Sequence, residues 1–550
     1  MTANGPSLSH AIGPTSAPLL DETLSANLAA TVRAFPDQEA LVVRHQDIRL
    51  TYSQLQAKVS ELAKGLIGAG FAKGDRLGIW SPNNAEWVLA QYATAQVGVI
   101  LVNINPAYRT HEVAYALGQS GCKGLIAAAD FKTSDYRAMV SEVRPELPEL
   151  EHVYFIDTSD WDDLIAAGST VSDEELSDRE ASLSPDEAIN IQYTSGTTGF
   201  PKGATLTHRN ILNNGFFVGE ACAYTTNDRV CIPVPFYHCF GMVLGNLACT
   251  THGATIVVPG PAFEPGATLE AVAEERCTSL YGVPTMFIAA LAHPGFADYD
   301  LSSLRTGIMA GSPCPIEVMK QCIEQMHMDQ VTIAYGMTET SPVSTQTAVD
   351  DPIDKRVATV GRVHPHVEIK VVDPETHETV PRGTSGEFCT RGYSVMAGYW
   401  NDPERTSEAI DRDGWMHTGD LAVMDEAGYV NIVGRIKDMV IRGGENIYPR
   451  EIEEFLYSHP QIVDVQVIGV PDARFGEELM AWIRCEEGVD LTAEDIREYC
   501  QGKIAHYKIP RYVKVTDEFP MTVTGKVQKF KLREAAIEEL DLKDDVQATA

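Results

Sequence analysis

Residues 193–208 of this 550-residue chain read YTSGTTGFPKGATLTH and combine three glycines, five threonines, a serine and a lysine. Glycine-rich backbone can present N–H groups to phosphate oxygens, and lysine adds a point charge. The stretch is not a Walker loop, in which lysine directly follows glycine. Here Phe200 and Pro201 separate Gly199 from Lys202. We expect an anion-binding loop, with a flexible surface turn as the alternative.

Other residues that could do chemistry each have a plain structural interpretation as well. His238 lies in the aromatic segment PFYHCFGM, where a packed core histidine is as reasonable as a functional one. Cys239 beside it makes a Cys–His nucleophilic pair conceivable, but neighbours on a strand point to opposite faces. Glu339 in YGMTET could mark a helix start, and Asp420 in HTGD could be a turn residue.

The formal net charge of −34 argues against a nucleic-acid partner or an anionic membrane surface. A polyanionic ligand would need a local positive site, and residues 501–533 offer one. A solvated basic face is the simpler interpretation of that charge run. Against Asp517 and Glu518 it holds eight basic residues: Lys503, Lys508, Arg511, Lys514, Lys526, Lys529, Lys531 and Arg533.

Eleven cysteines without a CxxC pair favour reduced thiols over a disulfide frame or a zinc site. We expect Cys231, Cys249 and Cys389 to be small core residues. The N-terminal sequence has no Lys or Arg before Arg33, unlike a secretory signal or an organelle transit peptide. No apolar run reaches the length of a membrane span. These observations predict a cytoplasmic protein, and a homodimer is compatible with the sequence.

Alternating helix-like and strand-like segments predict an α/β fold: a large N-terminal domain of layered, largely parallel sheets with helices. Residues 51–69 predict a helix with Leu55, Val59, Leu62 and Leu66 on one face. Residues 76–80 and 188–194 read as buried strands, and the second of these leads into the glycine-rich loop.

A domain boundary is expected near Gly434. Before it, a hairpin is predicted to turn at residues 426–428. After it, a βαβ-like order begins, with a helix opened by Pro449, strands from Ile462 and Leu479, and a capping box of Thr492 and Asp495. We therefore predict a domain of residues 1–434, followed by a small, mobile α+β domain of residues 435–550.

Taken together, the motifs resemble those of the adenylate-forming (AMP-binding) superfamily of acyl-CoA synthetases, peptide-synthetase adenylation domains and firefly-type luciferases. The resemblance extends from about Asn27 to Leu540, and IRGGENIYPREIE is most similar to fatty- and aryl-acid CoA ligases. The ordered matches are YTSGTTGFPKG, PFYHCFGM, AGSPCP, YGMTET, GEFCTRGYSVMAGYW, the segment DGWMHTGD through REIE, and PMTVTGKVQK.

The resemblance implies ATP, Mg²⁺ and coenzyme A as co-substrates or cofactor, and it implies roles for individual residues. Glu339 would bind Mg²⁺, Tyr335 would stack on adenine, and Asp420 would hold the ribose with Arg435. Lys526, Thr338, Glu339 and His238 would form the catalytic set. The implied ATP- and AMP-binding residues are Thr194, Ser195, Gly196, Thr197, Thr198, Gly199, Lys202, Gly311, Ser312, Pro313, Tyr335, Gly336, Thr338, Asp420, Arg435 and Lys526.

The second half-reaction implies a moving C-terminal domain. Lys437 matches the hinge of the family, His238 a wall of the acyl pocket, and Gly444 the glycine beside the pantetheine path. Among the basic residues near the C-terminus, none is assigned to the CoA phosphates.

The leading interpretation is a fatty acid:CoA ligase for medium-to-long chains. Apolar residues near the expected acyl pocket support it: Phe236, Val243, Leu244, Met309 and Val343. Alternatives are an aryl-acid CoA ligase, an enzyme that adenylates for a carrier protein or for oxidation, and a non-catalytic nucleotide sensor. A sensor would be expected to have lost some of the residues named above. A GxSxG hydrolase motif is absent from the sequence.

Overall fold

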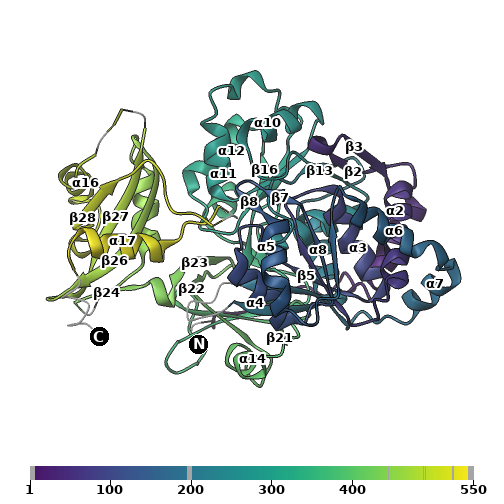
Figure 1. The fold of residues 1–550 in the computed structure, drawn as a ribbon. Coiled ribbons are helices and arrows are strands. Elements are labelled where there is room, and N and C mark those ends of the chain that lie inside the picture. Colours follow the sequence, from purple (N-terminus) through teal and green to yellow (C-terminus); the bar gives the residue numbers. More distant parts are fainter. Residues whose placement is uncertain are drawn as a thin grey trace, which may run out of the picture.

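The computed structural model describes residues 7–194, 201–443, 445–486, 488–489, 491–522 and 525–542. A large domain of three sheets with helices adjoins a smaller domain, drawn in yellow-green at the left of Figure 1. The α/β architecture predicted from the alternation of elements is confirmed.

The first sheet of the large domain has seven strands, and β10, β5, β4, β6 and β9 run parallel. Its predicted strands at residues 76–80 and 188–194 are confirmed as β4 and β10. In spatial order the strands are β21 (Gly398–Tyr399), β11 (Lys202–Thr207), β10 (Ala188–Thr194), β5 (Ile100–Asn103), β4 (Arg76–Trp80), β6 (Gly124–Ala127) and β9 (His152–Phe155).

The second sheet has nine strands, with β16, β15, β14, β12, β13 and β2 parallel. Its order is β18 (Arg362–Val363), β17 (Val343–Gln346), β16 (Gln330–Gly336), β15 (Thr306–Ala310), β14 (Ser279–Gly282), β12 (Arg229–Cys231), β13 (Thr255–Val258), β2 (Glu39–Val43) and β3 (Ile48–Thr51). Because carboxyl ends of adjacent parallel strands meet at one edge, the loops after β15 and β16 must lie together.

The third sheet is antiparallel throughout. The sequence analysis predicted largely parallel sheets and did not identify this antiparallel one. The predicted hairpin at residues 426–428 joins its last two strands, and Gly428 there has φ +85°. The order is β1 (His10–Ile12), β19 (Val367–Val372), β20 (Gly386–Gly392), β22 (Met416–Met424) and β23 (Val430–Arg435). A two-stranded ribbon adds β7 (Asp130–Phe131) and β8 (Ser134–Asp135).

The helix predicted at residues 51–69 is α2 (Tyr52–Gly68), which begins at a capping box of Thr51 and Gln54. Its leucines and valine at the predicted face are fully buried, and each contributes about 1.5–3 kcal/mol by burial. The other α-helices of the large domain are α1 (Leu24–Ala34), α3 (Ala85–Val97), α4 (Thr110–Ser120), α5 (Tyr136–Val143), α6 (Ser159–Ala167), α7 (Asp173–Ala181), α8 (His208–Ala221), α9 (Ala248–His252), α10 (Pro265–Glu274), α11 (Pro284–Leu291), α12 (Ile316–Gln325), α13 (Ile353–Ala358) and α14 (Pro403–Ala409).

The small domain contains its own sheet, core and helices. The predicted βαβ-like order is wrong at its centre, because the long strands β26 and β27 form an antiparallel pair. The predicted helix at Pro449 and the Thr492–Asp495 capping box are confirmed. The elements are β24 (Val440–Arg442), β25 (Glu445–Ile447), α15 (Pro449–Tyr457), β26 (Ile462–Asp472), β27 (Gly476–Cys485), α16 (Ala493–Cys500), β28 (Tyr512–Val515) and α17 (Lys529–Glu539).

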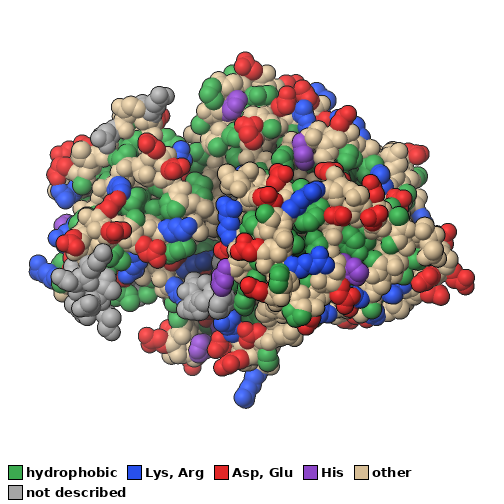
Figure 2. All heavy atoms as spheres, viewed as in Figure 1, with side chains coloured by type: hydrophobic (Ala, Val, Ile, Leu, Met, Phe, Trp, Pro, Cys, Tyr) green, Lys and Arg blue, Asp and Glu red, His purple; other side chains and the backbone are tan. Residues whose placement is uncertain are grey.

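No disulfide joins any of the eleven cysteines, all of which lie in the described ranges, and Cys231, Cys249 and Cys389 are buried, as predicted. Within the described ranges, no helix has both the length and the apolar character needed to cross a bilayer. On the face shown in Figure 2, acidic side chains are spread over both domains.

Candidate active site

The loops after β15 and β16 lie at one edge of the nine-stranded sheet, because Ala310 and Ala334 are register partners. The first loop contains Gly311, Ser312 and Pro313, and the second strand ends with Tyr335 and Gly336. A Cβ on Gly336 would stand 1.7 Å from the Pro342 carbonyl oxygen, so only glycine fits there. Several predicted nucleotide-binding residues are therefore brought together by sheet register.

Glu339 lies directly beyond this edge in the short helix η6 (Thr338–Thr340). Glu339 is 5% exposed, and its Oε1 accepts hydrogen bonds from the Tyr399 hydroxyl at 2.9 Å and the Thr194 hydroxyl at 3.3 Å. Thr338 is also buried. Among the residues the structure describes, no hydrogen bond reaches Oε2. One oxygen is thus fixed by two hydroxyls, and the other is available to a ligand.

Lys202 joins this cluster through Tyr399. The ammonium group lies 4.9 Å from the centre of the Tyr399 ring, a cation–π distance. Lys202 starts β11 and pairs with Thr194 at the end of β10. Thr194 and Lys202 therefore flank the glycine-rich loop, whose predicted residues Ser195, Gly196, Thr197, Thr198 and Gly199 lie outside the described residues.

Asp420 receives two side-chain contacts. Arg435, its register partner across β22 and β23, places Nε 3.1 Å from Oδ1, and the Tyr335 hydroxyl donates to Oδ2 at 2.7 Å. Burial raises the pKa of Asp420, although Arg435 opposes the shift. The Tyr335 ring packs edge-on against Phe388 with centroids 5.2 Å apart. Tyr335, Asp420 and Arg435 form one connected group.

Lys526 reaches the same region from the small domain. The Gly525 carbonyl accepts a hydrogen bond from the Thr285 hydroxyl at 3.0 Å, which fixes the Lys526 turn against the large domain. A Cβ on Gly311 would stand 3.4 Å from Lys526 Cε. Burial, followed by the charge of Arg435, lowers the pKa of Lys526 to about 8, while Asp420 and Glu339 act in the opposite direction. The ammonium therefore lies among these charges.

His238 lies in a turn before the π-helix η4 (Phe240–Leu247), where its Nδ1 accepts the Phe240 N–H at 3.2 Å. Burial and then the charge of Lys526 lower the pKa of His238 to about 3. The premise that His238 and Cys239 share a strand is wrong. Cys239 instead directs its buried thiol to Gln192 Oε1 at 3.2 Å, and burial raises its pKa. The Cys239 thiol therefore bonds to Gln192 and does not form a nucleophilic pair with His238.

Lys437 lies in the short helix η7 (Ile436–Asp438), two residues beyond Arg435, and Gly444 is outside the described residues. The predicted basic segment is largely engaged within the small domain. Five of its cations form ion pairs with carboxylates of that domain: Lys508, Arg511, Lys514, Lys529 and Arg533.

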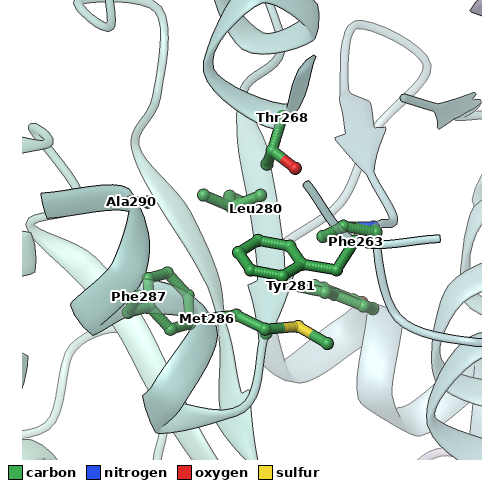
Figure 3. A pocket seen from close by; sticks show the side chains of 9 residues that line it. Phe263, Thr268, Leu280, Tyr281, Met286, Phe287 and Ala290 are labelled. Carbon is green, nitrogen blue, oxygen red and sulfur yellow. The ribbon is translucent and has the colours of Figure 1, made fainter. Parts of the chain in front are cut away.

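A small apolar pocket lies where β14 leads into α11, in the segment against which the Lys526 turn packs (Figure 3). It is lined by Pro233, Phe263, Thr268, Leu280, Tyr281, Gly282, Met286, Phe287 and Ala290. None of the five apolar residues expected around the acyl chain lines it. Phe236, Val243, Leu244, Met309 and Val343 are instead buried in the packed core.

Two residues of the site were not predicted. Tyr399 belongs to the GYW sequence, and only the antiparallel pairing of β21 with β11 brings it beside Lys202 and Glu339. Thr285 contacts the small domain from the start of α11. Neither residue has a local signal that separates it from an ordinary core or loop residue.

Curated relatives match this chain over nearly all of its length. YngI of Bacillus subtilis (strain 168), whose name gives acyl-CoA synthetase as a provisional activity, is 52% identical and aligns over 96% of this chain and 99% of its own. The mitochondrial medium-chain acyl-CoA ligase ACSF2 of Bos taurus is 47% identical over 95% of this chain and 89% of its own.

The fold matches solved structures as well. The anthranilate CoA ligase AuaEII in complex with anthranoyl-AMP superposes with a TM-score of 0.84 and 27% identity, covering 96% of this chain and 99% of that one. The family model described as AMP-binding enzyme matches residues 28–400, and the model of its C-terminal domain matches residues 451–526. The chain belongs to the AMP-binding enzyme family.

Proposed function

We propose that the protein is a fatty acid:CoA ligase that activates a medium-to-long-chain acid with ATP and transfers the acyl group to coenzyme A. One observation carries the proposal. Lys526 of the small domain lies beside Gly311 of the large domain, within electrostatic range of Glu339, Asp420 and Arg435. A cation, a metal-type carboxylate and a ribose-type carboxylate are the groups that carboxylate adenylation requires.

In the first half-reaction, a carboxylate oxygen of the acid attacks the α-phosphorus of ATP. The bond from the α-phosphorus to the bridging oxygen breaks, and pyrophosphate leaves. Lys526 would stabilise the negative charge that develops on the carboxylate and α-phosphate oxygens. Thr194, Lys202, Thr338 and the glycine-rich loop would hold the phosphates. Gly311, Ser312, Pro313, Tyr335 and Gly336 would hold adenine, and Asp420 and Arg435 the ribose.

Glu339 fits a Mg²⁺ ligand. Mg²⁺ prefers oxygen donors and usually takes one or two protein carboxylates together with phosphate oxygens. Oε1 of Glu339 is positioned by Tyr399 and Thr194, which leaves Oε2 for the ion. The ion would neutralise phosphate charge, and the other groups of the site would orient the two reactants.

The acyl tail is assigned to the pocket of Figure 3, and His238 to the carboxylate end of the acid. His238 is neutral at physiological pH because its pKa is near 3, so it can form an uncharged wall beside the carboxylate. The cavity volume of the pocket is about 10 Å³, far below the ~300–1,000 Å³ typical of ligand sites. A long chain would therefore have to displace flexible side chains such as Met286.

In the second half-reaction, the CoA thiol attacks the acyl carbonyl carbon and AMP leaves. We propose that residues 435–550 turn about Lys437, remove Lys526 from the site and bring the Gly444 segment to the pantetheine path. The proposed boundary after residue 434 falls within β23 (Val430–Arg435), the last strand of the antiparallel sheet. A homodimer and a cytoplasmic location stay predictions.

The deciding experiment measures pyrophosphate release with saturated acids from acetate to stearate and with benzoate, with and without coenzyme A. We expect octanoate or longer acids to give the highest kcat/KM and to yield thioester only with CoA. Pyrophosphate release without any thioester would favour adenylation for a carrier or for oxidation. A preference for benzoate would favour an aryl-acid ligase, and no release with any acid would favour a nucleotide sensor.

A further inference from the structure

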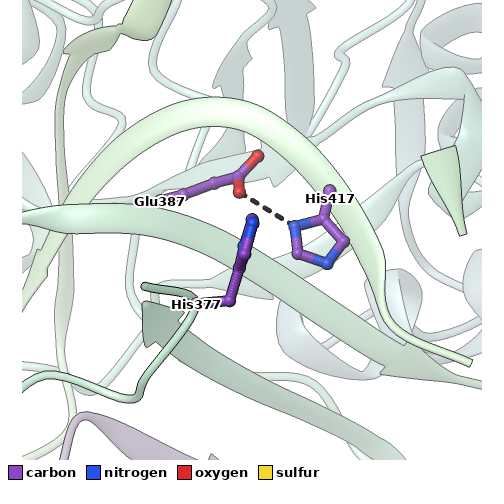
Figure 4. Close-up of side chains that lie close together, drawn as sticks. All are labelled: His377, Glu387 and His417. Atoms are coloured by element: carbon purple, nitrogen blue, oxygen red, sulfur yellow. Dashed lines mark hydrogen bonds and ion pairs between the residues drawn. The ribbon is translucent and has the colours of Figure 1, made fainter. Parts of the chain in front are cut away.

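His377, Glu387 and His417 converge on one point of the antiparallel sheet (Figure 4). Each offers one nitrogen or oxygen atom, and these three atoms lie within 4.8 Å of one another. His377 lies in the turn between β19 and β20, Glu387 in β20 and His417 in β22. The three residues come from separate segments, so tertiary structure gathers them.

Glu387 is held in a defined orientation. It is buried, and its Oε1 accepts the Gly419 N–H at 3.0 Å. Its Oε2 faces His417 Nδ1 at 2.9 Å. A tetrahedral ion with ligand bonds of about 2.0–2.1 Å sets its ligands about 3.4 Å apart, so this pair would open by only about half an ångström. His377 is exposed, and its ligand atom already lies within 4.8 Å of those of Glu387 and His417.

His417 also has the outer partner that metal-ligating histidines generally have. Its second nitrogen, Nε2, lies 3.6 Å from Asp411 Oδ2. Asp411 is itself fixed, because its Oδ1 accepts the N–H groups of Asp413 and Trp415 at 2.9 Å. A carboxylate behind the second nitrogen fixes the tautomer and orientation of a ligating imidazole.

The competing interpretation is an ion pair without a metal. Contacts with Cys389 and Glu387 raise the pKa of His417 to about 10, so an imidazolium would satisfy Glu387 alone. The ion pair of His417 and Glu387 does not explain why His377 lies beside them. Its ring stands edge-on to His417 with centroids 5.7 Å apart, and its nitrogen faces the same point. A second imidazole at a buried carboxylate points to a cation.

We propose that His377, Glu387 and His417 bind a zinc-class divalent ion. Two imidazoles and one carboxylate suit Zn²⁺ better than Mg²⁺ or Ca²⁺, which prefer sets of oxygen ligands. Cys389, the register partner of His417, adds a soft donor nearby, with Sγ 3.5 Å from Nδ1. The ion would join the His377 turn to β20 and β22. Strand β22 also carries Asp420, three residues after His417.

The test is zinc titration of the full-length, chelator-treated protein by calorimetry, with the absorption spectrum of Co²⁺ as a second readout. His377→Asn and Glu387→Gln should weaken zinc binding by at least about tenfold. His327→Asn is the matched control, because His327 and His377 are both exposed and both have a left-handed backbone conformation, with φ +62° and +57°. Asparagine tolerates that backbone conformation, so neither histidine variant is expected to strain the backbone. Because His377 is exposed, His377→Asn should fold normally and still tests the site if Glu387→Gln misfolds.

Wild type and His327→Asn should bind one zinc ion per chain with the same affinity, and zinc should raise their melting temperature. Absence of zinc binding in the wild type would overturn the proposal. Zinc binding that is unchanged in His377→Asn would also overturn it, because the ion would then lie elsewhere, for instance at Glu339.

Discussion

Asp420 and Arg435 are register partners across β22 and β23, and Arg435 Nε lies 3.1 Å from Asp420 Oδ1. The arginine side chain is 64% exposed, so the ion pair adds only about 0–1 kcal/mol to folding. Each carboxylate oxygen has one described side-chain donor and can accept a further hydrogen bond. The arrangement is therefore better explained by ligand binding than by stability.

Asp420→Asn should raise the KM for ATP by about 10–100-fold, the scale of a hydrogen bond to a charged group. The melting temperature should change little, because asparagine can still accept the Tyr335 hydroxyl. Asp425→Asn on the same hairpin is the control. Its carboxylate pairs with Lys355, outside the cluster, so the KM for ATP should stay unchanged. Equal KM values for wild type and Asp420→Asn would remove Asp420 from the ribose site.

Tyr399→Phe should raise the Mg²⁺ concentration needed for half-maximal pyrophosphate release by about tenfold, the effect of losing an outer partner of a metal ligand. Phenylalanine keeps the ring beneath Lys202 and removes only the hydroxyl that positions Glu339. Tyr335→Phe loses a hydroxyl that contacts Asp420 and should shift the ATP dependence instead. If the two variants have the same Mg²⁺ dependence as wild type, Tyr399 does not position a metal ligand.

The kcat/KM for ATP should fall as the pH rises through about 8, because Lys526 then loses its proton and its charge. The corresponding fall in kcat should occur at higher pH, since bound phosphates favour the charged lysine. His238, with a pKa near 3, should add no change near neutrality. Lys526→Gln should be slow and lack this fall. A wild-type profile without the fall, or an equal fall in Lys526→Gln, would contradict the assignment.

Local sequence patterns predicted the elements that deliver the site but not every contact within it. The periodicity of residues 51–69 and 188–194 identifies α2 and β10, because one buried face repeats within a short segment. The meeting of Tyr399 with Glu339 depends on the pairing of β21 with β11, which joins residues about two hundred positions apart in the chain. Periodicity within one short segment does not identify the distant segment that pairs with it.

The apolar residues chosen for the acyl pocket illustrate a second limit. Phe236 and Val343 are apolar and close in sequence to site motifs, yet both are buried in the packed core. The pocket proposed for the acyl tail is lined in part from β14 and α11, whose residues have the same composition as core residues. Apolar side chains at a cavity and in a core look alike in sequence, because only the packing around them differs.

Ala290→Phe should shift the acid preference towards shorter chains, because Ala290 lines the pocket and a phenyl ring would fill it. In wild type each buried methylene should add about 0.8 kcal/mol, so kcat/KM should rise several-fold per carbon. Ala292→Phe, an exposed position at the end of α11, is the control. The ratio of kcat/KM for dodecanoate to that for hexanoate should fall only in Ala290→Phe. An equal ratio in both variants would place the tail elsewhere.

Lys526 and Gly444 should serve different half-reactions although they belong to the same small domain. Lys526→Ala should slow pyrophosphate exchange by about 10²–10³-fold, the scale of one lost contact to developing charge. Thioester formation from prepared acyl-adenylate should survive, because the moved domain has taken Lys526 away. Gly444→Leu should leave pyrophosphate exchange intact and slow thioester formation, because its side chain would obstruct the pantetheine path.

The control for both variants is Lys531→Ala, which removes an exposed lysine five residues beyond Lys526 and should affect neither step. The two reactions are measured separately for each variant, with melting temperatures to exclude unfolding. Lys526 lies within electrostatic range of Glu339 and Asp420, the arrangement that the proposed first half-reaction would require. Equal losses of both steps in Lys526→Ala and Gly444→Leu would show that one fixed domain position serves both reactions, and the proposed turn about Lys437 would be wrong.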